Sequence, residues 1–505
     1  MLWMYFPTYT GNNINYGEVM VMGEKVKIVT SGEVKKTFQN CYDLSVREIC
    51  MGGAEGKIKA TVCYIDGLVS GITVADTIIR PATVKERFAS AKLESEVIDL
   101  ILKGGIYSYT AILRTELDAV IDDMLNGFCA LIFDAAGAAV TFEVRSPDKR
   151  SIDEPKEEKV VKGSKDVFIE IMRTNTMQVR RKLRNPNLRL KQITVGKTAK
   201  TSMVVAYIDG YTNMKYVEEM ERRLKNADFD SVVSAASVEE HIYDKPKSMF
   251  PQMLRTERPD RFCMNLLEGR VGLLIDGLPM GYLAPGTFSQ FYKVPDDNAK
   301  HYIVASAMTL LRYAAVIIAL LLPAFYVAIV MYHQEMLPPK LLMSIIESRK
   351  SVPFPTSLEV LGMLLAFELL QEAGLRLPNT IGQTVSIIGA LIVGQSAVEA
   401  KVISPVVVIV IALSGIASYT IPDQDMSAAI RVHRFLLVLT AIAAGLYGVV
   451  LCFAALIYNM CSMESFGVSY MEPFAGSKGS WARELLRFPL TKTQHIDPEL
   501  SKEKK

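Results

Sequence analysis

The last third of the chain is strongly apolar, and this feature limits the folds open to the sequence more than any other. Residues 310–458 include only 16 charged residues, and the mean hydropathy of the whole chain is +0.22. Residues 313–332, YAAVIIALLLPAFYVAIVMY, form a 20-residue run without a charge. Because a helix needs about 20 apolar residues to cross the hydrocarbon core of a bilayer, this run is predicted to span a membrane. Pro323 in its middle is tolerated in a membrane helix.

Four further segments of this third are apolar. Residues 435–458 form a 24-residue run without a charge, and residues 402–421 form another that ends before Pro422. Residues 382–400 carry Gln383, Gln395 and Glu399, and residues 358–373 carry three glutamates. Core helices of a soluble α-helical domain are the alternative interpretation, but so many apolar runs are hard to place in one soluble core. We therefore expect an α-helical multi-span membrane domain at residues 299–474, with four to six helical segments.

Positive charge at the end of the chain indicates an orientation. Seven lysines and arginines lie in the basic tail at residues 475–505, which favours the cytoplasmic side. A large charged N-terminal region with free cysteines favours the same side. Both ends inside require an even number of crossings, so residues 358–373 are expected to be re-entrant or interfacial. The basic residues assigned to loops do not decide the orientation: Lys340, Arg349, Lys350, Arg431 and Arg434.

Short apolar stretches that end in Asp-Gly or Asp-Ala recur in the first 300 residues. They read CYIDG at 63–67, LIFDA at 131–135, AYIDG at 206–210 and LLIDG at 273–277, a pattern that repeats after about 143 residues. Each is typical of a strand that enters a tight turn, and helical patterns lie between them. We therefore expect an α/β soluble region of two related subdomains, at residues 35–145 and 164–298. A charged linker at 146–163 joins them, and an N-terminal extension occupies residues 1–34.

Motifs of catalysis and metal binding are missing from the sequence. It has no phosphate-binding loop, no GxGxxG after a strand, no HExxH and no GxSxG. The seven cysteines form no CxxC pair, and the five histidines are scattered. The repeated turn aspartates are interpreted as structural, with catalysis as the alternative. We therefore expect no enzyme, cofactor or metal, and the net charge of +2 argues against nucleic acid as a partner.

A dense basic segment at residues 173–191 reads RTNTMQVRRKLRNPNLRLK. RNA or lipid headgroups are alternative partners for such a segment. The preferred interpretation is a helix face that meets a partner subunit, with Arg180, Arg181 and Lys182 as the contact residues.

Five polar residues in the apolar third form the candidate site: Glu359, Glu368, Glu372, Gln395 and Glu399. A charge in the centre of a membrane helix costs about 2.5–3.5 kcal/mol on insertion scales, and such residues often mark a path for ions or substrate. Glu368 and Glu372 share a helix face, as do Gln395 and Glu399, whereas Glu359 lies on the opposite side from Glu368. These residues are predicted to line or gate a pore, where a ring of acids would favour cations. The alternative is an interfacial helix whose acids lie among lipid headgroups.

Several long motifs together resemble one known family. They are PFP at 353–355, FELLQEAGLRLPNTIGQTVSIIGALIVGQSAVEA at 367–400, ISP at 403–405, RTNTMQVRRKLRNPNLR at 173–189, TERPD at 256–260, LLEGRVGLLIDGLP at 266–279, HQEMLP at 333–338 and SFGVSYMEP at 465–473. Over residues 150–475 the chain closely resembles the A-subunit family of bacterial spore germination receptors (GerA type). The last family motif usually reads SFGVPYL, and Ser469 replaces its proline here.

The resemblance implies a multi-pass protein of the spore inner membrane whose N-terminal region faces the spore core. It implies a B subunit of transporter-like fold and a C-subunit lipoprotein as partners. It also implies a homo-oligomer, a pentameric ring, that forms a nutrient-gated channel for monovalent cations and triggers germination. A paralogue encoded with the spore dipicolinic-acid channel genes is similar too, so an accessory ion channel that amplifies germination is an alternative. A non-conducting scaffold and a permease-like subunit are further alternatives, although the membrane region has no evident internal repeat.

Overall fold

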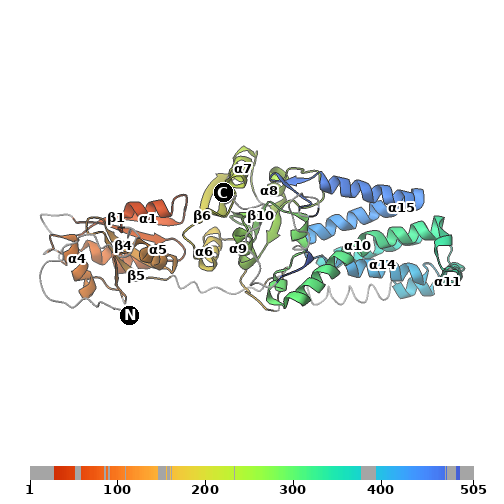
Figure 1. Ribbon diagram of the computed structural model, residues 1–505, viewed down its shortest axis with the longest axis horizontal. Helices are drawn as coiled ribbons and strands as arrows, with labels where there is room; N and C mark the ends of the chain where they lie inside the picture. Colours follow the sequence, from red (N-terminus) through yellow and green to blue (C-terminus); the bar gives the residue numbers. More distant parts are fainter. Residues whose placement is uncertain are drawn as a thin grey trace, which may run out of the picture. The chain divides into compact units, whose positions relative to one another are not determined.

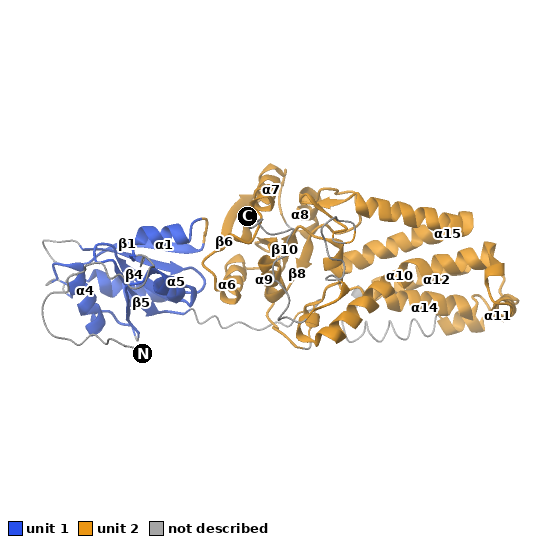
Figure 2. Ribbon diagram, viewed as in Figure 1, with its two compact units in different colours: residues 1–39, 43–148 blue, residues 40–42, 149–505 orange. Residues whose placement is uncertain are grey.

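The computed structural model describes residues 28–51, 58–84, 87–88, 91–108, 110–145, 162–232, 234–376, 394–472 and 485–488, with the single residues 155, 158, 160 and 474. Most of the predicted N-terminal extension, linker and basic tail, and residues 382–393 of one predicted apolar segment, lie outside the described residues. The chain divides into two compact units, residues 1–39 with 43–148, and residues 40–42 with 149–505 (Figure 2).

The first unit is built on a five-stranded antiparallel sheet. Its elements are α1 (Ser31–Thr37), β1 (Leu44–Met51), β2 (Ile58–Ile65), a run of short helices at 71–83, α4 (Glu94–Leu100), β3 (Ile112–Arg114), α5 (Leu117–Leu125), β4 (Phe128–Phe133) and β5 (Ala138–Glu143). The strand order is β1-β2-β4-β5-β3. Strands β4 and β5 are almost fully buried, as expected of central strands with apolar residues on both faces.

The second unit begins with the same arrangement. Its elements are α6 (Met172–Lys182), β6 (Leu188–Val195), β7 (Thr201–Ile208), α7 (Met214–Asn226), α8 (Ala235–Ile242), β8 (Leu254–Thr256), α9 (Pro259–Leu267), β9 (Val271–Ile275) and β10 (Gly281–Ala284). The sheet is again antiparallel with the equivalent order β6-β7-β9-β10-β8. The two sheets therefore share one topology, in agreement with the repeat of Asp-Gly turns in the sequence.

Two of the repeated turn aspartates have the same structural role, which is to accept a hydrogen bond from the start of a helix. Asp134 follows β4, and its carboxylate accepts hydrogen bonds from the Ser31 backbone N (2.6 Å) and hydroxyl (2.8 Å) at the start of α1. Asp276 follows β9 and accepts from the Met172 backbone N at the start of α6 (3.1 Å). A carboxylate at a helix N-terminus satisfies a backbone N–H that has no partner in the helix. These two contacts support the structural interpretation of the aspartates.

The edge strands β3 and β8 differ in their surroundings. Ile112 and Leu113 of β3 are 36% and 43% exposed, whereas Leu254 of β8 is 1% exposed. By their pairing with β5 and β10, Leu113 and Arg255 occupy equivalent positions. Arg255 forms an ion pair with Asp425 of the helical region (3.6 Å). In the second sheet the β8 edge is therefore covered by the helical region. In the first sheet the equivalent β3 edge is exposed within its own unit.

The helical region of the second unit follows β10. It contains α10 (Tyr302–Tyr332), α11 (Pro339–Arg349), α12 (Thr356–Arg376), α14 (Pro405–Ser418) and α15 (Gln424–Cys461), before a small hairpin of β11 (Glu464–Ser465) and β12 (Val468–Ser469) (Figure 1). Within the described residues, α10 and α15 are long and apolar enough to cross a membrane, while α14 has only 14 residues. These helices contain the predicted runs 313–332 and 435–458 and most of 402–421, and α12 contains 358–373.

Helix α15, which contains the uncharged run 435–458, is not one straight helix. Its backbone leaves the helical conformation at Ala444 (φ −141°, ψ 17°) and Gly445 (φ 60°, ψ −142°). Asp425 at its start and Ser462 just after its end both contact the same subdomain, through Arg255 and Lys245. A straight helix of 38 residues would hold these ends about 57 Å apart. Helix α15 is therefore a helical hairpin of residues 424–443 and 446–461.

The tip of the α15 hairpin rests on the end of α10. The Tyr332 hydroxyl donates to the Ile442 backbone oxygen (2.5 Å), which lies just before the break at Ala444 and Gly445. A side chain on Gly445 would meet the Tyr332 and His333 rings at 3.1 Å, and a side chain on Gly448 would lie 2.2 Å from the Thr440 backbone oxygen. A Cβ at Gly448 would push the two halves of the hairpin apart, and Gly445 has a positive φ that favours glycine.

Candidate functional site

A polar cluster joins α12 to α15 inside the apolar helices. Glu368 of α12 forms ion pairs with Arg431 (2.8 Å) and Arg434 (3.5 Å), one helical turn apart on α15. Arg431 also donates to the Gln371 side-chain oxygen (2.8 Å). The exposed fractions of the side chains are 33% for Glu368, 21% for Arg431 and 1% for Arg434. The cluster is therefore buried at Arg434 and accessible from the surface at Glu368.

Arg434 extends the cluster to two more helices. Its Nη1 donates to the Ser414 hydroxyl of α14 (3.3 Å), and that hydroxyl donates to the Ala319 backbone oxygen of α10 (2.9 Å). A single chain of polar contacts thus connects α12, α15, α14 and α10. Buried polar networks of this kind restrict how helices pack, because each group loses its partner if a helix moves.

Glu359 belongs to a separate buried contact at the other end of α12. Its Oε1 lies 3.4 Å from Arg349 Nε at the end of α11, and its Oε2 accepts from the Ser404 backbone N (2.8 Å). Ser404 is the N-cap of α14. The Glu359 side chain is fully buried, so it holds together the start of α12, the end of α11 and the start of α14. These contacts occupy both of its oxygens.

The remaining predicted polar residues are more exposed. Glu372 lies one turn after Glu368 on α12 and is exposed. Gln395 and Glu399 are exposed on the helical segment 394–399, where the Gln395 side-chain amide donates to Glu399 Oε1 (2.9 Å). Within the described residues, no hydrogen bond or ion pair joins Gln395 or Glu399 to the Glu368 cluster. The five candidate residues therefore lie at separate places and do not form a single site.

The basic segment is likewise divided by burial. Arg180 is 1% exposed, and its Nη1 donates to the Leu188 backbone oxygen (2.9 Å). Lys182 is half-buried and contacts Asp166 Oδ2 (3.0 Å) and the Ser164 hydroxyl (2.8 Å). Arg181 is exposed. Of the three predicted partner-contact residues, Arg181 is the one whose side chain lies at the surface.

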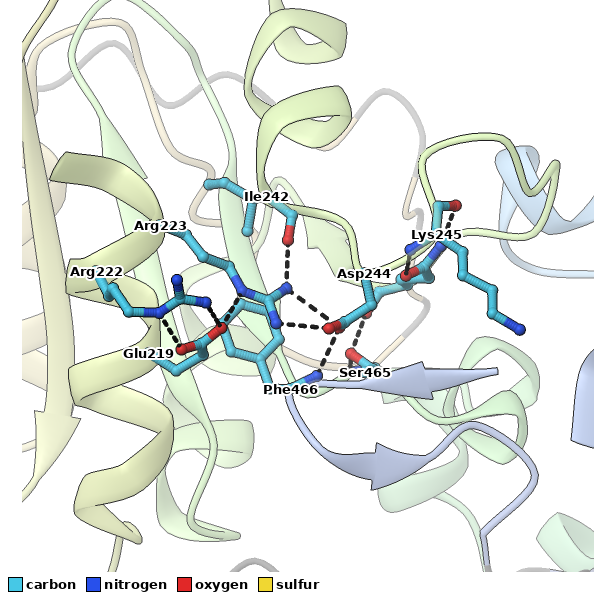
Figure 3. Close-up of polar contacts among 10 residues, drawn as sticks. Glu219, Arg222, Arg223, Ile242, Asp244, Lys245, Ser465 and Phe466 are labelled. Carbon is cyan, nitrogen blue, oxygen red and sulfur yellow. Dashed lines mark hydrogen bonds and ion pairs between the residues drawn. The ribbon is translucent and has the colours of Figure 1, made fainter. Parts of the chain in front are cut away.

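A second polar site connects the β11–β12 hairpin to the α/β subdomain (Figure 3). Phe466 (φ 53°) and Gly467 (φ 78°) form the two-residue turn of the hairpin. Positive φ at both positions is the geometry of a type I′ turn, which suits a tight β-hairpin. The Phe466 ring lies under the Arg223 guanidinium at 4.3 Å, and its backbone N donates to Asp244 Oδ2 (2.9 Å). The SFGV motif is therefore a hairpin tip bound to α7 and to Asp244, two residues after the end of α8.

Arg223 is the centre of this second site. It forms a two-pronged ion pair with Asp244 (2.6 and 3.1 Å) and an ion pair with Glu219 (2.7 Å), and it also donates to the Ile242 backbone oxygen. Hydrogen bonds from Arg222 and then Arg223 lower the pKa of the Glu219 carboxyl to about 2, against the opposite effect of partial burial. Glu219 is therefore ionised at neutral pH, and the guanidinium is fixed beneath the hairpin.

Two neighbouring contacts complete the attachment of the hairpin. Lys245 Nζ donates to the Ser462 backbone oxygen (2.7 Å) and hydroxyl (3.0 Å). The Ser465 hydroxyl donates to the Gln252 backbone oxygen (2.7 Å) and accepts from the Gly286 backbone N (3.1 Å). The end of α15 is thus bound to the subdomain by at least three side chains, from α7 and from the chain after α8.

Sequence reasoning missed the arginines of both sites. Arg431 and Arg434 were assigned to a loop, but they lie within the first three turns of α15 and face Glu368. Their spacing of three residues, followed by an uncharged run, is a signal of one helix face. Arg223 lies in a helix with many charges, and nothing in its local sequence distinguishes it. Among the described residues, no group of three or more His, Cys, Asp or Glu side chains could hold a metal ion.

Comparisons with known proteins give a consistent result. The family described as Bacillus/Clostridium GerA spore germination protein matches residues 32–498. The chain is 34% identical to spore germination protein KA of Bacillus subtilis (strain 168) over 475 residues, which cover 94% of this chain and 86% of that protein. It is 34% identical to the uncharacterized membrane protein YfkQ of the same organism, over 88% of this chain and 86% of that protein. A crystal structure of the N-terminal domain of the A subunit of the Bacillus megaterium spore germinant receptor GerK3 matches 51% of this chain and 93% of its own, with 28% identity and a TM-score of 0.40.

Proposed function

The chain belongs to the GerA family of spore germination proteins, and from this membership we propose that it is the membrane-embedded A subunit of a germinant receptor in the spore inner membrane. In this proposal it assembles with copies of itself into a pentameric ring that conducts monovalent cations when nutrients are sensed. A B subunit of transporter-like fold and a C-subunit lipoprotein complete the complex. The N-terminal region faces the spore core.

The arrangement of α15 is the observation that carries the proposal. Its first half begins at the α/β subdomain and its second half ends at the same subdomain, so both ends of this hairpin lie on one side of the membrane. Because both ends of the hairpin lie on one side, it adds no net crossing, and the other four predicted segments then give the even number that the proposed orientation requires. With this hairpin, residues 358–373 do not have to be re-entrant or interfacial for the number of crossings to be even. The α/β subdomain then lies next to the membrane and is attached directly to a helix pair within it.

The polar residues have different roles in this proposal. Glu359 and Glu368 are ion-paired with arginines, so their charges fix helix positions and are not offered to a passing cation. Glu372, Gln395 and Glu399 are exposed in the single chain and remain the candidates for a polar lining. Arg181 is the candidate contact with a partner subunit. An accessory ion channel that amplifies germination fits the same arrangement.

A non-conducting scaffold is the second candidate function. The ion pairs of Glu359 and Glu368 favour it, because they remove two of the five predicted lining residues. A permease-like subunit differs from both in that it would bind and carry a substrate, with a flux that saturates.

The experiment is ion flux through the purified full-length protein in liposomes, with the mass of the assembly measured on the same sample. A homo-oligomer that passes potassium or sodium supports the channel. Glu372→Gln and Glu399→Gln should then reduce cation flux, whereas Glu347→Gln, at an exposed surface pair, is the matched control. A monomer without flux, even beside its B and C partners, would contradict the channel and leave the scaffold.

A further inference from the structure

The Glu368 cluster has more positive charge than negative charge. Two guanidinium groups, Arg431 and Arg434, face one carboxylate, Glu368. Within the described residues, no second carboxylate lies within ion-pair distance of either arginine. Residues 377–393, which lie outside the described part of the chain, contain no charged side chain in the sequence. Among the residues that the structure describes, one guanidinium charge is therefore left without an opposite charge between the apolar helices.

Two other buried ion pairs among the described residues of this region are balanced, in contrast to the cluster. Arg349 pairs with Glu359, and Arg312 pairs with Asp297 through two hydrogen bonds (2.6 and 2.8 Å). A buried charge without an opposite charge is costly, because the solvation it loses is not replaced. The imbalance at Arg431 and Arg434 thus marks a place where something else is expected to supply the missing negative charge.

Hydrogen-bond donors are in excess at the same place. The Nε atoms of both Arg431 and Arg434 are buried and have no hydrogen-bond partner in the described structure. Arg434 is 1% exposed, so this donor cannot be satisfied by bulk solvent. A guanidinium has five N–H donors in a planar fork that matches an oxyanion. Unused charge and unused donors therefore coincide, and the half-exposed Glu368 and Arg431 give access to them.

We propose that Arg431 and Arg434 form a binding site for a singly charged carboxylate between α12 and α15. A single negative charge matches the single uncompensated guanidinium, and the planar carboxylate matches the guanidinium fork better than a halide does. The carboxylate is that of a free small anion or of an acidic side chain from a neighbouring chain. This inference rests on the contacts of the helices and not on ion conduction, so it holds for a channel and for a scaffold.

Acetate is the probe, and thermal unfolding of the full-length protein in detergent is the measurement. At constant ionic strength, acetate should raise the unfolding temperature in a saturable way, and chloride should do so less. Glu368→Gln removes the competing carboxylate and leaves two uncompensated charges. It should therefore lower the acetate concentration at half-effect by about tenfold. Arg431→Gln restores a balance of one to one and should abolish the effect.

Two further variants keep the test independent of misfolding. Arg431→Lys retains the charge without the fork and should weaken the acetate effect without removing it. Arg349→Gln breaks a balanced pair and should leave the effect unchanged. A fall in the mass of the assembly on adding acetate assigns the natural carboxylate to a neighbouring chain, and an unchanged mass assigns it to a free anion. Loss of the acetate response in Glu368→Gln, or an equal response in all variants, would overturn the proposal.

Discussion

The substitution Gly448→Ala tests the hairpin structure of α15 most directly. An alanine Cβ at this position would lie 2.2 Å from the Thr440 backbone oxygen, whereas Cβ atoms in real structures stay at least 3.0 Å from such neighbours. The two halves of the hairpin must therefore separate by about 0.8 Å, the difference between these distances. Because a backbone oxygen cannot rotate away as a side chain can, we expect a cost of about 1–3 kcal/mol, typical of overpacking.

Gly362→Ala is the matched control within the same region. Gly362 lies on α12, is exposed, and has nothing within 4 Å of an added Cβ. Alanine should stabilise this helix by up to about 1 kcal/mol, since it is the better helix former. Thermal unfolding in detergent should place Gly448→Ala about 2–12 °C below the unmodified protein, from about 2–4 °C per kcal/mol. Gly362→Ala should unfold at or above it.

A straight α15 would reverse this expectation. In a continuous helix Gly448 would be an ordinary interior glycine, so alanine should stabilise it as at Gly362. Equal or higher stability of Gly448→Ala would therefore refute the hairpin. Labelling provides an independent check, because Cys461 is exposed and the hairpin predicts that it reacts from the same side of a vesicle as a cysteine introduced at Gln424.

Three other outcomes follow from the contacts described. Arg223→Ala removes the charge-assisted bonds to Asp244 and the contact with the Phe466 ring, worth together about 2–4 kcal/mol; limited proteolysis near the β11–β12 hairpin should become faster, and unchanged cleavage would count against the attachment. Asp134→Ala should destabilise the first sheet unit by about 0.5–2 kcal/mol through loss of the contact to α1, measured by denaturant unfolding of the full chain, whereas Asp134→Asn should retain most of the stability. The lowered pKa of Glu219, about 2 against 4.5 for an ordinary glutamate, means that its contribution to stability is present above pH 4.5 and is lost as pH falls toward 2. Glu219→Gln should therefore flatten the pH dependence of unfolding in that window, and an unchanged profile would contradict the assignment.

The repeated sheet could be predicted because its signal is local. Each Asp-Gly turn lies at the end of a short apolar strand, and two such turns at equal spacing specify one unit twice. Helix α10 could be predicted for the same reason, since 20 uncharged residues suffice. The break in α15 could not, because Gly445 and Gly448 look like the small residues that membrane helices use for close packing. Only contact with α10 and with the subdomain shows that the chain turns there.

The ion-pair partners of the acidic residues could not be predicted from the sequence either. Glu368 and Arg431 are 63 residues apart, and their meeting depends on how α12 packs on α15. Helical spacing identified that Glu368 and Glu372 share a face, but it could not show that one of them faces an arginine pair. The five candidates looked alike because each was a polar residue in an apolar run. Packing separated the ion-paired glutamates from the exposed ones.

The unequal surroundings of β3 and β8 bear on which substitutions the two sheets tolerate. Of the two sheets that share one topology, the second carries the helices, through Arg255 and the segment before β8. Every substitution on that edge is therefore constrained by the bundle. The equivalent edge of the first copy, with Leu113 where the second has Arg255, carries no such obligation within its own unit. A substitution on the β8 edge therefore disturbs the helices as well as its own sheet, whereas within the first unit a substitution on the β3 edge disturbs its own sheet alone.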